Sequence, residues 1–97
     1  MQRRYSVKII GIQESKGEYE GFKYHNYIFY CKNSGMPTVA GVVVERIKIK
    51  SDVISNFHER FGDGKKLNDF FNYLIGKEIY IFYNRYGQPD VIDLIEE

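Results

Sequence analysis

The sequence predicts a mostly β domain of five short strands, with a helical segment between the third strand and the fourth. Aromatic and β-branched stretches alternate with polar residues, glycine-containing turns separate these stretches, and one central segment repeats its apolar residues at helical spacing. The 97 residues are expected to form one domain over residues 1–97, because a chain of this length can bury enough surface for one hydrophobic core, with little margin.

The first predicted strand runs from Tyr5 to Glu14, where apolar and polar residues alternate. An isolated glycine inside a strand often marks a bulge or a bend. We therefore expect the strand to bend at Gly11 and to pass there from one partner strand to another. The following segment, Ser15–Gly21, is polar and contains two glycines, so we expect it to be a loop that forms a wide hairpin.

The second predicted strand, Phe22–Lys32, is unusual because it carries rings on both faces. Tyr27 and Phe29 share one face, which we assign to the core. Tyr24 and Tyr30 share the other face, which must be either a second buried surface beneath a helix or an exposed aromatic platform. Large exposed apolar surface usually marks a binding site.

The third predicted strand, Val39–Lys50, carries a row of cations. Arg46, Lys48 and Lys50 alternate with isoleucines, so they share a face at intervals of about 7 Å, twice the strand rise. This row is a candidate binding ridge. The alternative is an ordinary solvated face, or a sheet edge that lysines protect from further pairing.

Two helical segments are expected next, from Ser51 to Gly62 and from Leu67 to Gly76, each with an apolar stripe at helical spacing. Their aromatic residues are expected in the core. Strand character resumes over Lys77–Tyr83, a turn follows at residues 84–89, and Val91–Ile95 is the last predicted strand.

Charge and cysteine content limit the function classes. The formal net charge of +1, from 14 basic and 13 acidic residues, excludes a strongly basic protein that binds any polyanion. Any nucleic-acid binding must therefore come from the local distribution of charge. The single cysteine, Cys31, cannot form an internal disulfide, and there is no apolar run of membrane-spanning length. We expect a cytoplasmic protein without a membrane partner.

Enzymatic sites find little support. His25 and Cys31 share a strand face but lie about 20 Å apart along an extended chain, too far for a thiol and imidazole pair. The two histidines and one cysteine lack zinc-ligand spacing, and no glycine-rich phosphate loop follows a strand. We therefore expect no catalytic residue, no metal ligand, no cofactor and no enzymatic activity.

Five strands, a bent first strand and a helical connection between strands three and four resemble the OB-fold, a partly open five-stranded barrel. An α+β roll is the alternative. In OB-folds the ligand crosses strands two and three, between the loops after strand one and between strands four and five. The resemblance implies a nucleic-acid site that gathers these rings and cations: Lys16, Tyr19, Phe22, Lys23, Tyr24, Tyr30, Arg46, Lys48, Lys50, Arg85 and Tyr86.

Such a set suits a sequence-tolerant single-strand binder, because bases stack on aromatic rings while Lys and Arg contact phosphates. In size and layout the chain is similar to the small single-stranded DNA-binding proteins of phages and mobile elements. That similarity implies coating of single strands, often by a homodimer. The sequence leaves open whether the protein works alone or beside replication or conjugation proteins. DNA and RNA both remain open as ligands. The competing hypothesis is a protein-interaction adaptor or oligomerisation module that uses the same aromatic face.

Overall fold

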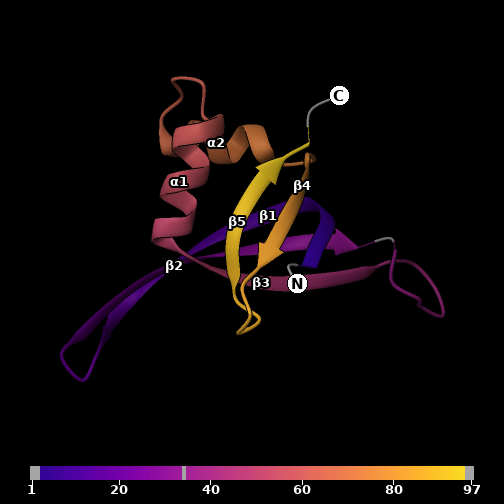
Figure 1. Ribbon diagram of the computed structural model, residues 1–97, viewed down its shortest axis with the longest axis horizontal. Helices are drawn as coiled ribbons and strands as arrows, with labels where there is room; N and C mark the ends of the chain where they lie inside the picture. The colour runs from indigo at the N-terminus through magenta and orange to yellow at the C-terminus, as the bar shows by residue number, and fades with distance from the viewer. Residues whose placement is uncertain (1–2, 34, 96–97) are drawn as a thin grey trace.

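The computed structural model describes residues 3–33 and 35–95, which form five strands and two helices (Figure 1). The predicted class, mostly β with a helical insertion between the third and fourth strands, is confirmed. In chain order the elements are β1 (Arg3–Tyr19), β2 (Phe22–Asn33), β3 (Val43–Lys50), α1 (Ser51–Phe61), α2 (Leu67–Leu74), β4 (Glu78–Tyr83) and β5 (Pro89–Leu94).

All five strands belong to one antiparallel sheet, in the order β3-β2-β1-β4-β5. The long strand β1 is shared by two partners. Its residues from Arg3 to Lys8 pair with β4, and those from Lys8 to Tyr19 pair with β2. The register shifts between Ile9 and Gly11, where the strand changes partner. The predicted bend at Gly11 is therefore confirmed.

Beyond the last pairing with β3, strands β1 and β2 continue alone as a two-stranded ribbon, residues 16–19 and 22–25 (Figure 1, lower left). The ribbon ends in a two-residue turn with φ of 50° at Glu20 and 82° at Gly21. Two positive φ values in sequence match the twist of a tight hairpin. The loop predicted over Ser15–Gly21 is wrong, because this turn lets polar residues pair as strand up to Tyr19.

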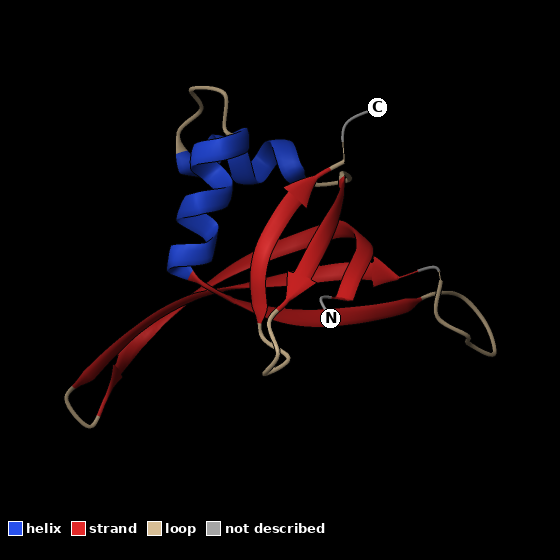
Figure 2. Ribbon diagram, in the orientation of Figure 1, coloured by secondary structure: helices blue, strands red, loops and turns tan. Residues whose placement is uncertain are grey.

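The core lies between the inner face of the sheet and the two helices, which sit together at one end of the sheet (Figure 2). Tyr27, Phe29 and Cys31 of β2 are buried there, as predicted. Phe57 of α1 and Phe70 of α2 are fully buried and pack edge to face against each other, with ring centroids 5.1 Å apart. This contact joins the two helices. Phe71 of α2 packs edge to face against Tyr27 of β2, with ring centroids 5.0 Å apart, which holds α2 to the sheet.

The sheet curves around this core without closing. β3 and β5 are its two edge strands, and no ladder joins them within residues 3–33 and 35–95. β3 begins at Val43, four residues later than predicted, because the preceding segment forms an exposed loop. No helix in the described part of the chain is long and apolar enough to cross a membrane.

Candidate nucleic-acid interface

The outer face of β2 and β3, opposite the core, carries two of the predicted rings, Tyr24 and Tyr30, and the three predicted cations of β3. Across the ladder between β2 and β3, Tyr30 pairs with Arg46, Ile28 with Lys48, and Asn26 with Lys50. Directly paired residues point to the same face. The cationic row of β3 and the aromatic row of β2 therefore share the outer face, as the alternation predicted.

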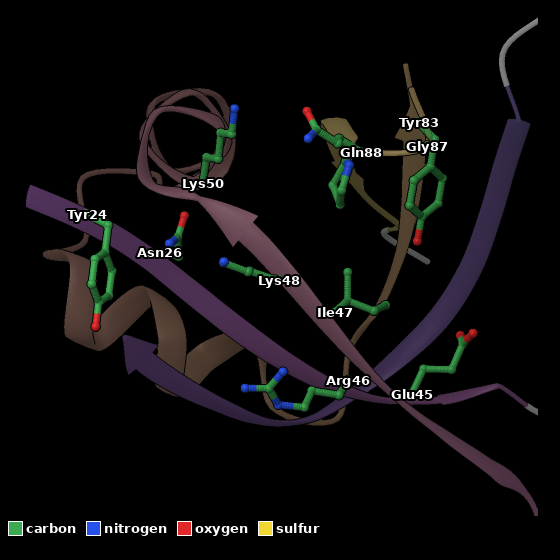
Figure 3. A pocket seen from close by; sticks show the side chains of 11 residues that line it. Tyr24, Asn26, Glu45, Arg46, Ile47, Lys48, Lys50, Tyr83, Gly87 and Gln88 are labelled. Carbon is green, nitrogen blue, oxygen red and sulfur yellow. The ribbon is translucent and has the colours of Figure 1, made fainter. Parts of the chain in front are cut away.

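A groove of about 660 Å³ separates β3 from the turn between β4 and β5 (Figure 3). The three cations of β3 lie along one side of it, and the residues of the turn lie on the other. Tyr24 stands at the end nearest the ribbon. The lining consists of Tyr24, Asn26, Glu45, Arg46, Ile47, Lys48, Lys50, Tyr83, Gly87, Gln88 and Pro89.

The cations of the groove are available to an anionic ligand. Arg46, Lys48 and Lys50 are exposed, and none of them forms an ion pair with another residue of the described chain. They stand about 7 Å apart along β3. Glu45 brings one carboxylate to the lining, and this carboxylate also accepts a hydrogen bond from Asn33 Nδ2 at 3.4 Å. The groove therefore carries a local excess of positive charge on a nearly neutral chain.

Tyr24 and Tyr30 differ, although they share a face. Tyr24 is 46% exposed and lines the groove. Tyr30 is half-buried, lies outside the groove lining, and donates a hydrogen bond from its hydroxyl to Gln13 Oε1 at 2.9 Å. The platform predicted from both tyrosines is therefore provided mainly by Tyr24.

The ribbon holds four of the predicted residues away from the groove. Tyr19 and Phe22 pair across its tip and are 70% and 78% exposed. Lys16 and Lys23 line a separate shallow hollow of about 710 Å³, to which Tyr24 also contributes. All four are strand residues, so the prediction that Lys16 and Tyr19 belong to a loop is wrong.

Arg85 and Tyr86 lie in the turn between β4 and β5, as predicted, but neither lines the groove. The guanidinium of Arg85 stands 5.2 Å from the centre of the Tyr86 ring. Asn84 organises the turn, since its Oδ1 accepts hydrogen bonds from the backbone N–H groups of Tyr86 and Gln88. Arg85 and Tyr86 therefore stand beside the groove as an exposed pair.

Tyr83 and Gln88, which lie across the groove from β3, were not predicted as site residues, and neither was Asn26 of β2. Tyr83 was assigned to the fourth strand without a role, and Gln88 to an ordinary turn. Asn26 of β2 was passed over as a polar residue among rings. Their available signal was position: Tyr83 and Gln88 flank the loop that the OB-like layout places at the ligand.

The Cys31 thiol and the His25–Glu14 pair are titratable sites that lie outside the groove. Burial, followed by the nearby charge of Glu45, raises the pKa of the Cys31 thiol to about 12, so the thiolate is disfavoured. His25 Nε2 lies 2.8 Å from Glu14 Oε2 on the opposite face of the sheet from the groove. Within the described residues, no group of three or more His, Cys, Asp or Glu side chains is arranged to hold a metal ion.

Comparison with protein-family models, curated proteins and solved structures finds no match for this chain.

Proposed function

We propose that this protein binds single-stranded nucleic acid, DNA in the first instance, along the groove between β3 and the β4–β5 turn. The observation that carries the proposal is the row of Arg46, Lys48 and Lys50, exposed and without ion pairs to described residues, beside an exposed ring at Tyr24. Cations in a row match the repeating charge of a phosphate backbone, and a ring beside them suits an unpaired base.

The chain's low net charge is compatible with this proposal. Contacts to phosphate depend on the cations that lie near the bound nucleic acid and not on the net charge. Three of the 14 basic residues line this one groove. A duplex offers no exposed base faces, so the ring at Tyr24 favours a single strand over a double one. Sequence tolerance follows, because every base has a face that stacks.

The arrangement of the strands gives further support. The sheet order, the bent β1 and the helices between β3 and β4 match the layout of an OB-fold whose seam between β3 and β5 is open. The groove runs along the edge of β3, at the open seam beside the β4–β5 turn, and such folds hold oligonucleotides across strands two and three and the loop between strands four and five. Fold likeness alone does not assign function, so the proposal depends on the groove.

The test is a titration of fluorescently labelled oligo-dT, followed by anisotropy at 50 mM and 200 mM salt. Engagement of three phosphates predicts that the logarithm of the association constant falls by about 2 for each tenfold rise in salt. An oligo-rU of equal length compares RNA with DNA, and a duplex of equal length is the control. Absence of binding to both single strands at low salt contradicts the proposal.

The exposed pair Tyr19 and Phe22 at the ribbon tip favours a second candidate, a protein-interaction module. Aromatic residues are frequent interface anchors, and this pair lies at the tip of the ribbon, which projects from the rest of the sheet (Figure 1). This candidate predicts self-association, or a stable complex with a partner protein, that survives high salt. The Tyr19→Ala/Phe22→Ala variant would abolish such association and would leave the groove intact.

A further inference from the structure

The tyrosine at the ribbon end of the groove lies across a glycine of the neighbouring strand. Gly17 and Tyr24 pair directly in the ladder between β1 and β2, so both face outward. A Cβ atom at position 17 would lie 2.6 Å from Tyr24 Oη, 2.9 Å from Cζ and 3.2 Å from Cε1. The far end of the ring therefore occupies the space that any other side chain at position 17 would fill.

We propose that the ring of Tyr24, laid on the backbone at Gly17, is a pre-formed platform for one planar nucleobase, and that Gly17 is the residue that positions it. This inference rests on the single-strand binding proposed above. It adds the chemistry of one subsite, a base and not a phosphate, and a residue that acts without touching the ligand.

The environment of the ring supports this assignment. Tyr24 is 46% exposed although its ring covers Gly17, so the side of the ring away from the backbone is open. Within the described residues, no other ring and no Lys or Arg side chain stacks on it. A ring held in one place loses little freedom on binding, which favours affinity.

Lys50 of β3 offers a phosphate site next to this base site. Lys50 pairs with Asn26, which lies on the same face of β2 as Tyr24 and two residues, or about 7 Å, along the strand from it. Lys50 is therefore a diagonal neighbour of Tyr24 in the sheet. One nucleotide then spans both, with its base on Tyr24 and its phosphate at Lys50. Both side chains line the same groove.

Gly17→Ala tests the role of Gly17 because the added methyl group displaces the Tyr24 ring and leaves the fold intact. The φ of Gly17 is not in the positive range, so an alanine backbone fits there. The atoms it would meet are the end of a side chain that can swing away. Gly11→Ala is the matched control: Gly11 is also in β1 opposite a tyrosine, Tyr30, but an added Cβ would lie at an ordinary 3.8 Å.

Affinity for labelled oligo-dT is measured for the wild type, Gly17→Ala, Tyr24→Ala, Tyr24→Phe, Gly11→Ala and the Gly17→Ala/Tyr24→Ala double variant. Loss of one stacked base is expected to weaken binding about 5- to 150-fold in Gly17→Ala and in Tyr24→Ala. The double variant is expected to bind like Tyr24→Ala alone, because Gly17 acts through the ring. Tyr24→Phe keeps the ring and is expected to recover most of the affinity that Tyr24→Ala loses. Gly11→Ala is expected to bind like the wild type.

An abasic oligonucleotide of equal length separates base from phosphate contacts: its affinity is expected to be the same for the wild type and for Gly17→Ala. Without ligand, NMR should show the Gly17 Hα protons shifted upfield by the Tyr24 ring, and the shift should vanish in Tyr24→Ala. Wild-type affinity in Gly17→Ala, or additive losses in the double variant, overturns the inference while single-strand binding stands. A wild type that binds no single strand fails at the earlier step and overturns both.

Discussion

His25 Nε2 and Glu14 Oε2 lie 2.8 Å apart on the face of β1 and β2 opposite the groove. The Tyr27 hydroxyl donates a longer hydrogen bond, at 3.5 Å, to the same carboxylate oxygen. The hydrogen bond from His25 is the main reason that the pKa of Glu14 is lowered from its ordinary value of 4.5. These contacts join the base of the ribbon to the edge of the core.

This pair predicts an acid-dependent contribution to stability. A carboxyl group whose pKa is lower in the folded state stabilises the fold above its unfolded pKa, and loses that effect as the pH falls through the folded value. Thermal unfolding of the wild type and Glu14→Gln should therefore differ at pH 7 and converge below about pH 4.5. The difference should be small, since both side chains are partly exposed. A difference that persists unchanged well below pH 4.5 would contradict this assignment.

The buried thiol of Cys31 predicts chemical inertness. Because burial raises its pKa to about 12, the reactive thiolate is scarce and the sulfur is shielded from reagent. We expect no reaction with a disulfide reagent such as DTNB over minutes in native buffer, and stoichiometric reaction in denaturant. Rapid labelling of the native protein would show that β2 separates readily from the helices.

Arg60 ties α1 to β5 through two contacts. Its Nη1 donates to Asp93 Oδ1 at 2.8 Å, and its Nη2 donates to the backbone carbonyl of Ile92. Charge-assisted hydrogen bonds to a partly buried carbonyl are expected to contribute about 1–2 kcal/mol. Arg60→Ala should lower the free energy of unfolding by that amount. Arg85→Ala removes the same charge from an exposed turn and should leave stability within about 0.5 kcal/mol of the wild type.

Lys48 lies in the middle of the cationic row and predicts a change in salt dependence. Loss of one phosphate contact on a single strand should reduce the slope of log K against log salt by about 0.7 in Lys48→Ala. Lys66→Ala is the control, because Lys66 is exposed at the start of α2 and does not line the groove. Equal slopes for the two variants would place the phosphate contacts elsewhere.

The two faces of β2 could be predicted because side chains alternate strictly along a strand. The period of two places Tyr27 and Phe29 on one face, which we assign to the core, and Tyr24 on the other. It leaves open whether that other face is buried, and there Tyr24 is 46% exposed whereas Ile28 is 4% exposed. The same rule placed Arg46, Lys48 and Lys50 on one face. Parity within a single strand is a local property, so it needed no knowledge of the partner strands.

The contact between Gly17 and Tyr24 could not be predicted, because it depends on register between strands. The tight turn at Glu20 and Gly21 sets that register, and neither residue type there is diagnostic of the turn on its own. The polar residues before the turn favoured the prediction of a loop, and a loop residue at position 17 would have no partner on a neighbouring strand. The residues across the groove from β3 could not be predicted for a similar reason: Tyr83 faces β3 across the groove only because the whole sheet curves.

The shared strand β1 also has a consequence for the order of folding. Its pairing with β2 joins neighbours in the chain across a two-residue turn, so this hairpin closes at little entropic cost. Its pairing with β4 joins Val7 to Ile79 and encloses β2, β3 and both helices. During synthesis the first half of β1 cannot pair with β4 until β4 has left the ribosome, and we expect this long-range closure to be slower than formation of the β1–β2 hairpin.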